Sequence, residues 1–282
     1  MKKLVILSWV LAISGITAAA YANYQVTQLN TMVTELRSQN QFDTMLENNA
    51  PKFNDHIQKR ISVFIDNERK KVAQAKFNKY KSASISLSNE GKRIYGSEKA
   101  RYTLVEFSDT ECPYCKKFHD TPKQLVDASN GLVNWEWKHM PLGFHNPSAL
   151  QASVAAECAN DVGGNQAFWT FLQSVFDTTK GNGQGAGSLM NLAMDLNLDT
   201  EAFAKCLKNP KHLEKVQADL QHAESIGVKA TPVTYIVDNK TGRQLKMKGM
   251  VKPVALVSAI QKLKKEADDV SSTESANQEK KG

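Results

Sequence analysis

Cysteine is scarce in this sequence and is absent from its first hundred residues. Only four cysteines occur, Cys112, Cys115, Cys158 and Cys206, so the segment before Cys112 carries neither thiol chemistry nor disulfides. An even number of cysteines is compatible with disulfide bonds if the protein is exported to an oxidising compartment. Four cysteines allow three pairings, and the positions along the chain must decide between them.

Long apolar stretches and blocks of like charge are also missing beyond the start of the chain. The 282 residues are 41% hydrophobic and 23% charged, which is typical of a globular protein. The formal net charge is +7, but lysine and arginine alternate with acids, so there is little support for nucleic-acid binding. No cluster of methionine or histidine supports a role in handling copper.

The one long apolar stretch stands at the N-terminus. Met1-Lys2-Lys3 is followed by apolar residues 4–16, and Ala20-Tyr21-Ala22 has the small-x-small pattern that signal peptidase recognises. We therefore predict a signal peptide over residues 1–22, cleaved after Ala22, and export of the chain. The alternative is an uncleaved membrane anchor, for which residues 4–21 are at the short end.

Residues 23–80 have a helical rather than a strand-like pattern and contain no tryptophan. Apolar side chains recur every three or four residues in two stripes: Val26, Leu29, Val33 and Leu36, and then Phe53, Ile57, Ile61, Phe64, Ile65 and Val72. We predict two amphipathic helices, broken near residues 48–51. Their apolar faces need a partner. A second copy of the chain would provide one in a homo-oligomer; packing on the chain's own domain, or a charged spacer, is the alternative.

A serine-rich linker over residues 81–94 precedes a region of mixed strand and helix patterns at 95–267. The expected elements are strands at 101–108, 132–142, 232–238 and 243–249, and helices at 113–129, 188–196, 200–207 and 252–267. Helical patterns fill residues 147–225, around a glycine-rich loop at 181–187. The order predicts an α/β fold with a helical domain inserted at about 146–225. The polar tail at 268–282 is expected to be disordered.

The Cys112-Pro113-Tyr114-Cys115 motif lies directly after the first buried strand and at the start of a helix. Unpaired backbone N–H groups and the positive end of the helix dipole stabilise a thiolate there. Cys112 is therefore the expected nucleophile, and Cys115, one turn later, is the expected resolving thiol. Pro113 is suited to the first helical turn.

Two other interpretations of this motif are weaker. A purely structural Cys112–Cys115 disulfide would close too small a loop to stabilise much. Half of a zinc site with His119 would need two more ligands, and Cys158 and Cys206 are single cysteines in separate helical segments. We therefore expect no metal and no cofactor.

Three features together resemble the DsbA-like thioredoxin superfamily over about residues 95–267. They are Val105-Glu106-Phe107 before the Cys-Pro-Tyr-Cys motif, the helical insertion, and Ala230-Thr231-Pro232-Val233. The resemblance implies a thioredoxin fold and a periplasmic thiol–disulfide oxidoreductase. It also implies that the Thr231–Pro232 bond is cis and faces the Cys112 sulfur. Thr231 and Pro232, with Pro113 and Tyr114, would then contact an extended substrate.

The resemblance gives roles to the remaining candidate residues. Glu106 would be a buried acid that relays protons to Cys115; otherwise it is a strand carboxylate satisfied elsewhere. Cys158 and Cys206 would form a disulfide that cross-links the helical insertion; otherwise they are two buried free thiols. The implied partners are exported proteins with cysteines and a membrane redox partner.

The direction of the redox reaction is less firmly indicated. The Cys-Pro-Tyr-Cys motif, Thr231 and the N-terminal helices resemble isomerase-type and suppressor-of-copper-sensitivity (ScsC-like) relatives, whereas the insertion resembles that of the oxidase. We expect a disulfide isomerase, with a dithiol oxidase as the alternative. A chaperone-like binding module that uses the thioredoxin cleft is the alternative from another class of function.

Overall fold

The computed structural model describes residues 20, 22–34, 40–83 and 91–279. The expected signal peptide therefore lies almost entirely outside the described residues. The chain divides into two compact units, residues 1–66 and 67–282, and α2 (Asn40–Asn78) crosses the boundary. None of the described helices has both the length and the apolar character that crossing a bilayer requires.

The first unit is helical, over residues 22–34 and the beginning of α2. The break expected near residues 48–51 is wrong, because α2 continues through Pro51. A proline removes one helical hydrogen bond and can kink a helix without ending it. Much of the apolar stripe is exposed within this unit, for example Leu29 at 67% and Phe64 at 65%; Leu36 and Phe53 are outside the described side chains.

The second unit begins earlier than the sequence pattern indicated. Ala73, Tyr80 and Ala83 are buried, and the Tyr80 hydroxyl donates a hydrogen bond to Gln173 over 2.6 Å. Strand β1 (Arg93–Tyr95) lies in the expected linker, and Ala83 bridges to Tyr95. The boundaries expected at residues 80 and 95 therefore need correction, because the end of α2 packs into the core of the second unit.

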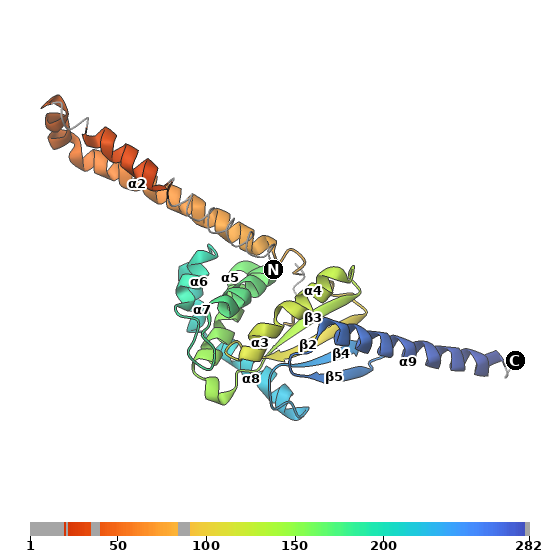
Figure 1. Ribbon diagram of the computed structural model, residues 1–282. Helices are drawn as coiled ribbons and strands as arrows, with labels where there is room; N and C mark the ends of the chain where they lie inside the picture. Colours follow the sequence, from red (N-terminus) through yellow and green to blue (C-terminus); the bar gives the residue numbers. More distant parts are fainter. Residues whose placement is uncertain (1–19, 21, 35–39, 84–90, 280–282) are drawn as a thin grey trace, which may run out of the picture. The chain divides into compact units, whose positions relative to one another are not determined.

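A five-stranded sheet in the order β1-β3-β2-β4-β5 forms the centre of this unit (Figure 1). Strand β2 (Tyr102–Ser108) pairs in parallel with β3 (Val133–His139) and antiparallel with β4 (Val233–Asp238). Strand β5 (Gln244–Lys248) and β1 are the two edges, both antiparallel to their neighbours. The central position of β2 explains why nearly all of its side chains are buried, because both of its faces are covered.

The helices beside the sheet differ from expectation in two places. One helix was expected over 113–129, but α3 (Pro113–Phe118) and α4 (Asp120–Ala128) are separated at His119. Helix α9 (Pro253–Glu279) continues past residue 267 into the tail that was expected to be disordered. The tail has no glycine or proline before Gly282 that would end the helix.

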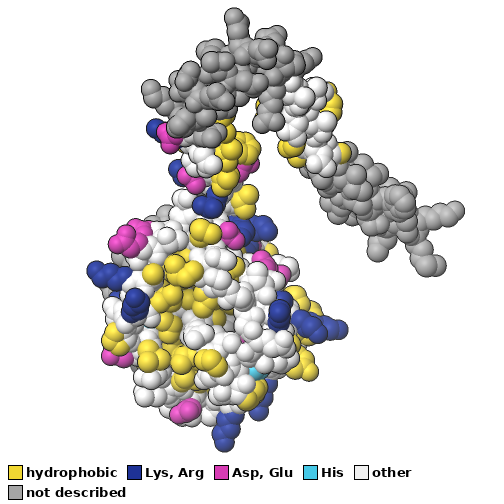
Figure 2. Space-filling view, turned by 90° about the vertical axis from the view of Figure 1, so that its left-hand side faces the viewer, with side chains coloured by type: hydrophobic (Ala, Val, Ile, Leu, Met, Phe, Trp, Pro, Cys, Tyr) yellow, Lys and Arg dark blue, Asp and Glu magenta, His cyan; other side chains and the backbone are white. Residues whose placement is uncertain are grey.

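The helical insertion consists of α5 (Ser148–Thr178), α6 (Leu189–Asp195), α7 (Thr200–Leu207) and α8 (Pro210–Ser225). Helix α5 is interrupted at Gly164, whose φ of 77° is a left-handed conformation that suits glycine. Figure 2 looks onto the α6–α7 side, where hydrophobic side chains gather. A pocket of about 560 Å³ in the insertion is lined mainly by such residues: Leu150, Val154, Leu189, Leu207, Pro210 and Leu213.

Candidate active site

Cys112 and Cys115 lie where the central strand leads into helix α3. A short loop follows β2, and Cys112 is the N-cap residue of α3, with Pro113 in the first turn. Both cysteines are free thiols; Cys115 is fully buried, while 6% of Cys112 is exposed. Tyr114, between them, is 62% exposed. The motif thus combines one exposed aromatic ring with two thiols, of which Cys112 is the less deeply buried.

The environment makes the two thiols chemically different. A hydrogen bond with Cys115 is the main cause that lowers the pKa of Cys112 to about 5; contacts with Thr231 and with the backbone N–H groups of Tyr114 and Cys115 add to it, against burial. Burial, followed by the proximity of Cys112, raises the pKa of Cys115 well above its ordinary value. At neutral pH the first sulfur is a thiolate and the second is a thiol.

The loop before β4 faces the reactive sulfur. The Thr231–Pro232 peptide bond is cis, and the Cys112 sulfur lies 3.6 Å from the Thr231 carbonyl oxygen, to which it donates a hydrogen bond when it is protonated. The Thr231 hydroxyl is buried and has no hydrogen-bond partner among the described residues. Gly249 donates its N–H to the Pro232 carbonyl over 2.8 Å, which ties this loop to the end of β5. Residues far apart in sequence therefore meet at Cys112.

Glu106 is the buried acid below this pair. It is fully buried in the middle of β2, and burial raises its pKa to about 8. No hydrogen bond of good geometry reaches either carboxylate oxygen from a described residue. Ser108 is near enough to Glu106 and to Cys115 to lower the pKa of each. A group that changes protonation near neutral pH thus shares Ser108 as a neighbour with the resolving thiol.

Two acids that no sequence motif indicated, Asp109 and Glu111, hold the loop before Cys112. Asp109 accepts hydrogen bonds from the N–H groups of Glu111 and Leu142, and its Oδ2 lies 2.7 Å from Nδ1 of His145. This acid therefore anchors the chain segment that enters the helical insertion.

Glu111 anchors the segment that leaves helix α5. Its carboxylate accepts the Thr179 hydroxyl at 2.5 Å and the Gly185 N–H at 2.9 Å, and its carbonyl oxygen accepts the Asn182 N–H at 2.7 Å. Lys116 also donates to the Thr179 carbonyl oxygen. The glycine-rich loop at 181–187 is thereby held beside the motif. In the sequence, the only indication of this contact is that acids lie next to Cys112 and that a glycine-rich loop is present.

His119 is not positioned as a metal ligand for the Cys112–Cys115 pair. Its ring is buried against Trp135, Trp137 and Phe176, and burial lowers its pKa to about 3. It packs as a neutral ring where the Tyr80 hydroxyl approaches its Nε2 to 3.5 Å.

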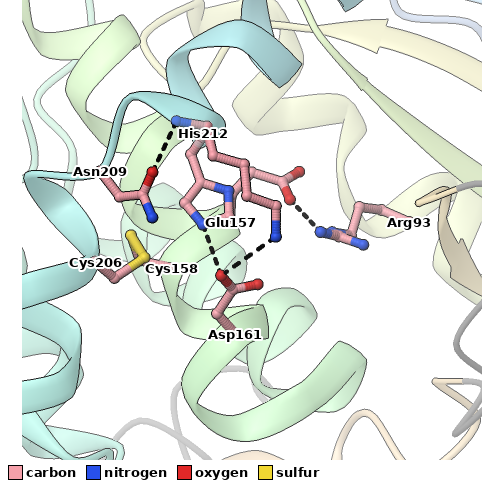
Figure 3. The surroundings of a disulfide bond; sticks show 8 residues. Arg93, Glu157, Cys158, Asp161, Cys206, Asn209 and His212 are labelled. Carbon is pink, nitrogen blue, oxygen red and sulfur yellow. Dashed lines mark hydrogen bonds and ion pairs between the residues drawn. A yellow bond between two sulfur atoms is a disulfide. The ribbon is translucent and has the colours of Figure 1, made fainter.

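The other two cysteines meet inside the helical insertion. Cys158 of α5 and Cys206 of α7 form a disulfide with an S–S distance of 2.10 Å, although they are 48 residues apart in sequence. Figure 3 shows this bond beside His212, Asp161 and the Arg93–Glu157 ion pair. The structure thus separates the four cysteines into a thiol pair and a disulfide.

Comparisons with known proteins agree with this geometry. A family model described as Thioredoxin matches residues 88–255, more than half of the chain. The crystal structure of Pseudomonas aeruginosa DsbA2 is 36% identical and superimposes with a TM-score of 0.55 over 61% of this chain and 93% of that chain. Wolbachia pipientis alpha-DsbA1, at 23% identity and a TM-score of 0.53, covers 64% of this chain and 94% of that chain; it shows the fold alone.

Among curated relatives, the Na(+)/H(+) antiporter NhaA of Herminiimonas arsenicoxydans is 35% identical over 154 residues. The match covers 54% of this chain and 23% of the antiporter, so the chain spans less than a quarter of the length of this relative. The match to the thioredoxin family model, together with the similarity to DsbA2, shows that the chain belongs to the DsbA-like thioredoxin superfamily of thiol–disulfide oxidoreductases.

Proposed function

We propose that the protein is an exported, periplasmic thiol–disulfide interchange protein that acts on folding proteins with cysteines, mainly as a disulfide isomerase. The observation that carries the proposal is the contrast between the Cys112 thiolate and the Cys115 thiol. An isomerase attacks with a reduced, ionised thiol, and a pKa of about 5 keeps the reduced Cys112 ionised at neutral pH.

The reaction begins when the Cys112 thiolate attacks one sulfur of a client disulfide. A bond forms between Cys112 and that sulfur, and the client's other sulfur leaves as a thiolate that takes up a proton. A different client thiolate then attacks the mixed disulfide and leaves the client with a new pairing. No net oxidation or reduction of client or enzyme occurs.

Cys115 provides an exit when the client does not rearrange. Its thiol must lose a proton before it can attack Cys112, and its raised pKa makes this unfavourable in isolation. Glu106, with a pKa of about 8 and with Ser108 nearby, is suited to accept that proton. This attack releases a reduced client and leaves a Cys112–Cys115 disulfide, which a membrane redox partner would reduce.

The cis-proline loop is proposed to bind the client's backbone. An extended client segment can pair with this loop, as strands pair at sheet edges, while its side chains contact Pro113 and Tyr114. The Thr231 hydroxyl, which has no partner among the described residues, would gain one from the client.

The exposed apolar residues of the first unit support a homo-oligomer through residues 23–80. Ile57, Ile61, Phe64 and Ile65 recur on one side of α2 and are all exposed. Several active sites held around one client would favour repeated attack on wrongly paired cysteines. Oligomerisation is thus the proposed link between the helical extension and isomerase activity.

The test is reactivation of scrambled ribonuclease by the reduced mature chain. Ile61→Asp combined with Phe64→Asp places charge on the apolar side of α2, while Ser62→Asp combined with Asn67→Asp adds the same charge at exposed positions outside it. We expect the first pair to reduce both the mass in light scattering and the reactivation, and the second pair to change neither. Unchanged reactivation by a monomer would contradict the link.

A dithiol oxidase is the second candidate, and the low pKa of Cys112 also favours it. A stabilised thiolate makes the corresponding disulfide a stronger oxidant. Rapid oxidation of reduced ribonuclease by the disulfide form, with no reactivation of scrambled ribonuclease by the reduced form, would establish the oxidase instead.

A further inference from the structure

Three ligand-type side chains converge in the helical insertion, away from Cys112. Cys158 lies on α5, Cys206 on α7 and His212 on α8, and one ligand atom of each lies within 4.8 Å of the others. No other group of three or more such ligands occurs among the described residues. The sequence pattern presents Cys158 and Cys206 as isolated cysteines, and the tertiary structure brings them together with a histidine.

The arrangement does not depend on the disulfide alone. Helices α5 and α7 are packed through Phe171 and Phe203, whose ring centroids are 5.5 Å apart. The Asn209 side chain caps α8 by accepting the Lys211 N–H at 3.0 Å (Figure 3), which fixes the turn just before His212. Reduction of the S–S bond would therefore leave two thiols and an imidazole held close together by helix packing.

Asp161 adds the partner that a metal-bound histidine ordinarily has. Its Oδ2 lies 2.8 Å from Nε2 of His212, and Figure 3 shows the two side chains pointing toward one another. A carboxylate in this position orients the imidazole of a metal ligand or can serve as an oxygen ligand itself. His212 is buried, whereas Asp161 is exposed at a pocket of about 270 Å³, which gives an ion a path from solvent.

The charges around the cluster are compatible with a cation. Two thiolates neutralise a divalent ion, and Lys211, 3.9 Å from Asp161, balances that carboxylate. Three other basic residues, Lys92, Arg93 and Lys215, line the same pocket; Arg93 is paired with Glu157, and Lys215 with Asp219 at 2.5 Å.

We propose that Cys158, Cys206 and His212 bind Zn²⁺ when the Cys158–Cys206 disulfide is reduced, with Asp161 orienting His212 or completing the site. Two sulfur ligands and one imidazole are the donor set of tetrahedral zinc sites. A dithiol reductant supplies two electrons and two protons to the disulfide and becomes a disulfide itself. Zn²⁺ then displaces the two thiol protons as it binds. A disulfide oxidant reverses the process: it takes up two electrons and two protons and becomes a dithiol, the Cys158–Cys206 bond forms again, and the ion is released.

Cobalt(II) is the probe for this site, because tetrahedral thiolate–cobalt complexes are coloured. The full mature chain carries Cys112→Ser and Cys115→Ser, so that only the second cysteine pair can contribute sulfur ligands. We expect the reduced chain to bind one Co²⁺ with thiolate charge-transfer bands that Zn²⁺ abolishes, and the oxidised chain to show none. Absence of these bands in a reduced chain that keeps its helical circular dichroism would overturn the proposal.

Variants of Asp161 and His212 distinguish a metal site that includes these residues from metal binding by the two thiols alone. In this background, Asp161→Asn should weaken Co²⁺ binding by about 10- to 100-fold, as loss of an orienting carboxylate does, and His212→Ala by at least as much. His222→Ala, an exposed histidine on the same helix, is the matched control and should have no effect. Equal affinity in the His212→Ala chain and its parent would also overturn the proposal, as would a chain that unfolds on reduction and does not refold with zinc.

Discussion

The two cysteine pairs of this chain show how surroundings decide what the same side chain does. Cys112 and Cys115 are separated by two residues, begin a helix beside a cis-proline loop, and have pKa values moved in opposite directions. Cys158 and Cys206 are 48 residues apart, lie on two packed helices, and form a disulfide. The first environment stabilises one thiolate; the second brings two sulfurs together.

Proximity alone therefore does not make a cysteine pair reactive. At the first pair, hydrogen bonds favour the ionised form of one sulfur while burial suppresses ionisation of the other. At the second pair, the sulfur atoms are within a helical core, and a disulfide there restricts the unfolded chain. Four experiments test this division, in order of decreasing expected effect.

The largest effect is expected from Cys112→Ser. A serine hydroxyl is not ionised at neutral pH, so the rate of disulfide interchange should fall by at least about 1000-fold, equivalent to about 4 kcal/mol of barrier. A fluorescent disulfide peptide measures this rate. The matched variant Cys158→Ser/Cys206→Ser should retain the parent rate; activity that depended on the second pair instead would break the comparison.

Loss of the second pair should act on stability rather than on rate. Replacing Cys158 and Cys206 with alanine removes a cross-link between residues 48 apart, which is worth about 4 kcal/mol by loop-closure entropy. Urea unfolding of the oxidised parent and the variant measures the difference in free energy of unfolding. The pKa of Cys112, followed by thiolate absorbance, should stay near 5 in both. A loss of less than about 1 kcal/mol would argue against the cross-linking role.

Glu106→Gln should show how much an ionised buried carboxylate near Cys112 and Cys115 lowers the free energy of unfolding. Burial raises the pKa of Glu106 from 4.5 to about 8, so the folded chain holds this proton more tightly than the unfolded chain. The carboxyl group therefore destabilises the fold increasingly as pH rises from about 4.5 through 8. A pKa difference of one between the folded and unfolded chains corresponds to about 1.4 kcal/mol, so the variant should gain up to a few kcal/mol over the parent by pH 8.

Unfolding of the reduced parent and the Glu106→Gln chain across this pH range is the measurement. Because Cys112 is present in both chains, its own titration largely cancels in the difference. If Glu106 accepts the proton of Cys115, as proposed, the variant should also resolve the Cys112 mixed disulfide more slowly. A stability difference that does not vary with pH would show that folding does not raise the pKa of Glu106.

The smallest effect is expected at the loop beside the first pair. Glu111→Gln removes one hydrogen-bond acceptor from the contacts with Thr179 and Gly185, which should cost about 1 kcal/mol and raise amide exchange at residues 181–185. Thr179→Val removes the donor of the same contact. If Glu111 positions the loop through Thr179, the double variant should lose less than the sum of the two single variants.

Local sequence patterns predicted the elements with strong periodicity but not their long-range contacts. The strand containing Glu106 and the helices of the insertion were expected close to their observed positions. The packing of Tyr80 into the catalytic domain was not expected, because its partners Gln173 and Tyr95 are distant in sequence. A helix end was expected near Pro51 because proline locally disfavours a helix. The loss of one helical hydrogen bond did not end α2, which continues through Pro51.

By itself, the sequence determined that a Cys-Pro-Tyr-Cys motif stands between a buried strand and a helix, because hydrophobic pattern and helix-start signals are local. Only the tertiary structure decided that Glu111 holds the glycine-rich loop and that His212 joins Cys158 and Cys206. The contact of Glu111 with Gly185 joins segments 74 residues apart, and packed helices bring His212 to the two cysteines. Their formation depends on the packing of the whole domain, which no local pattern encodes.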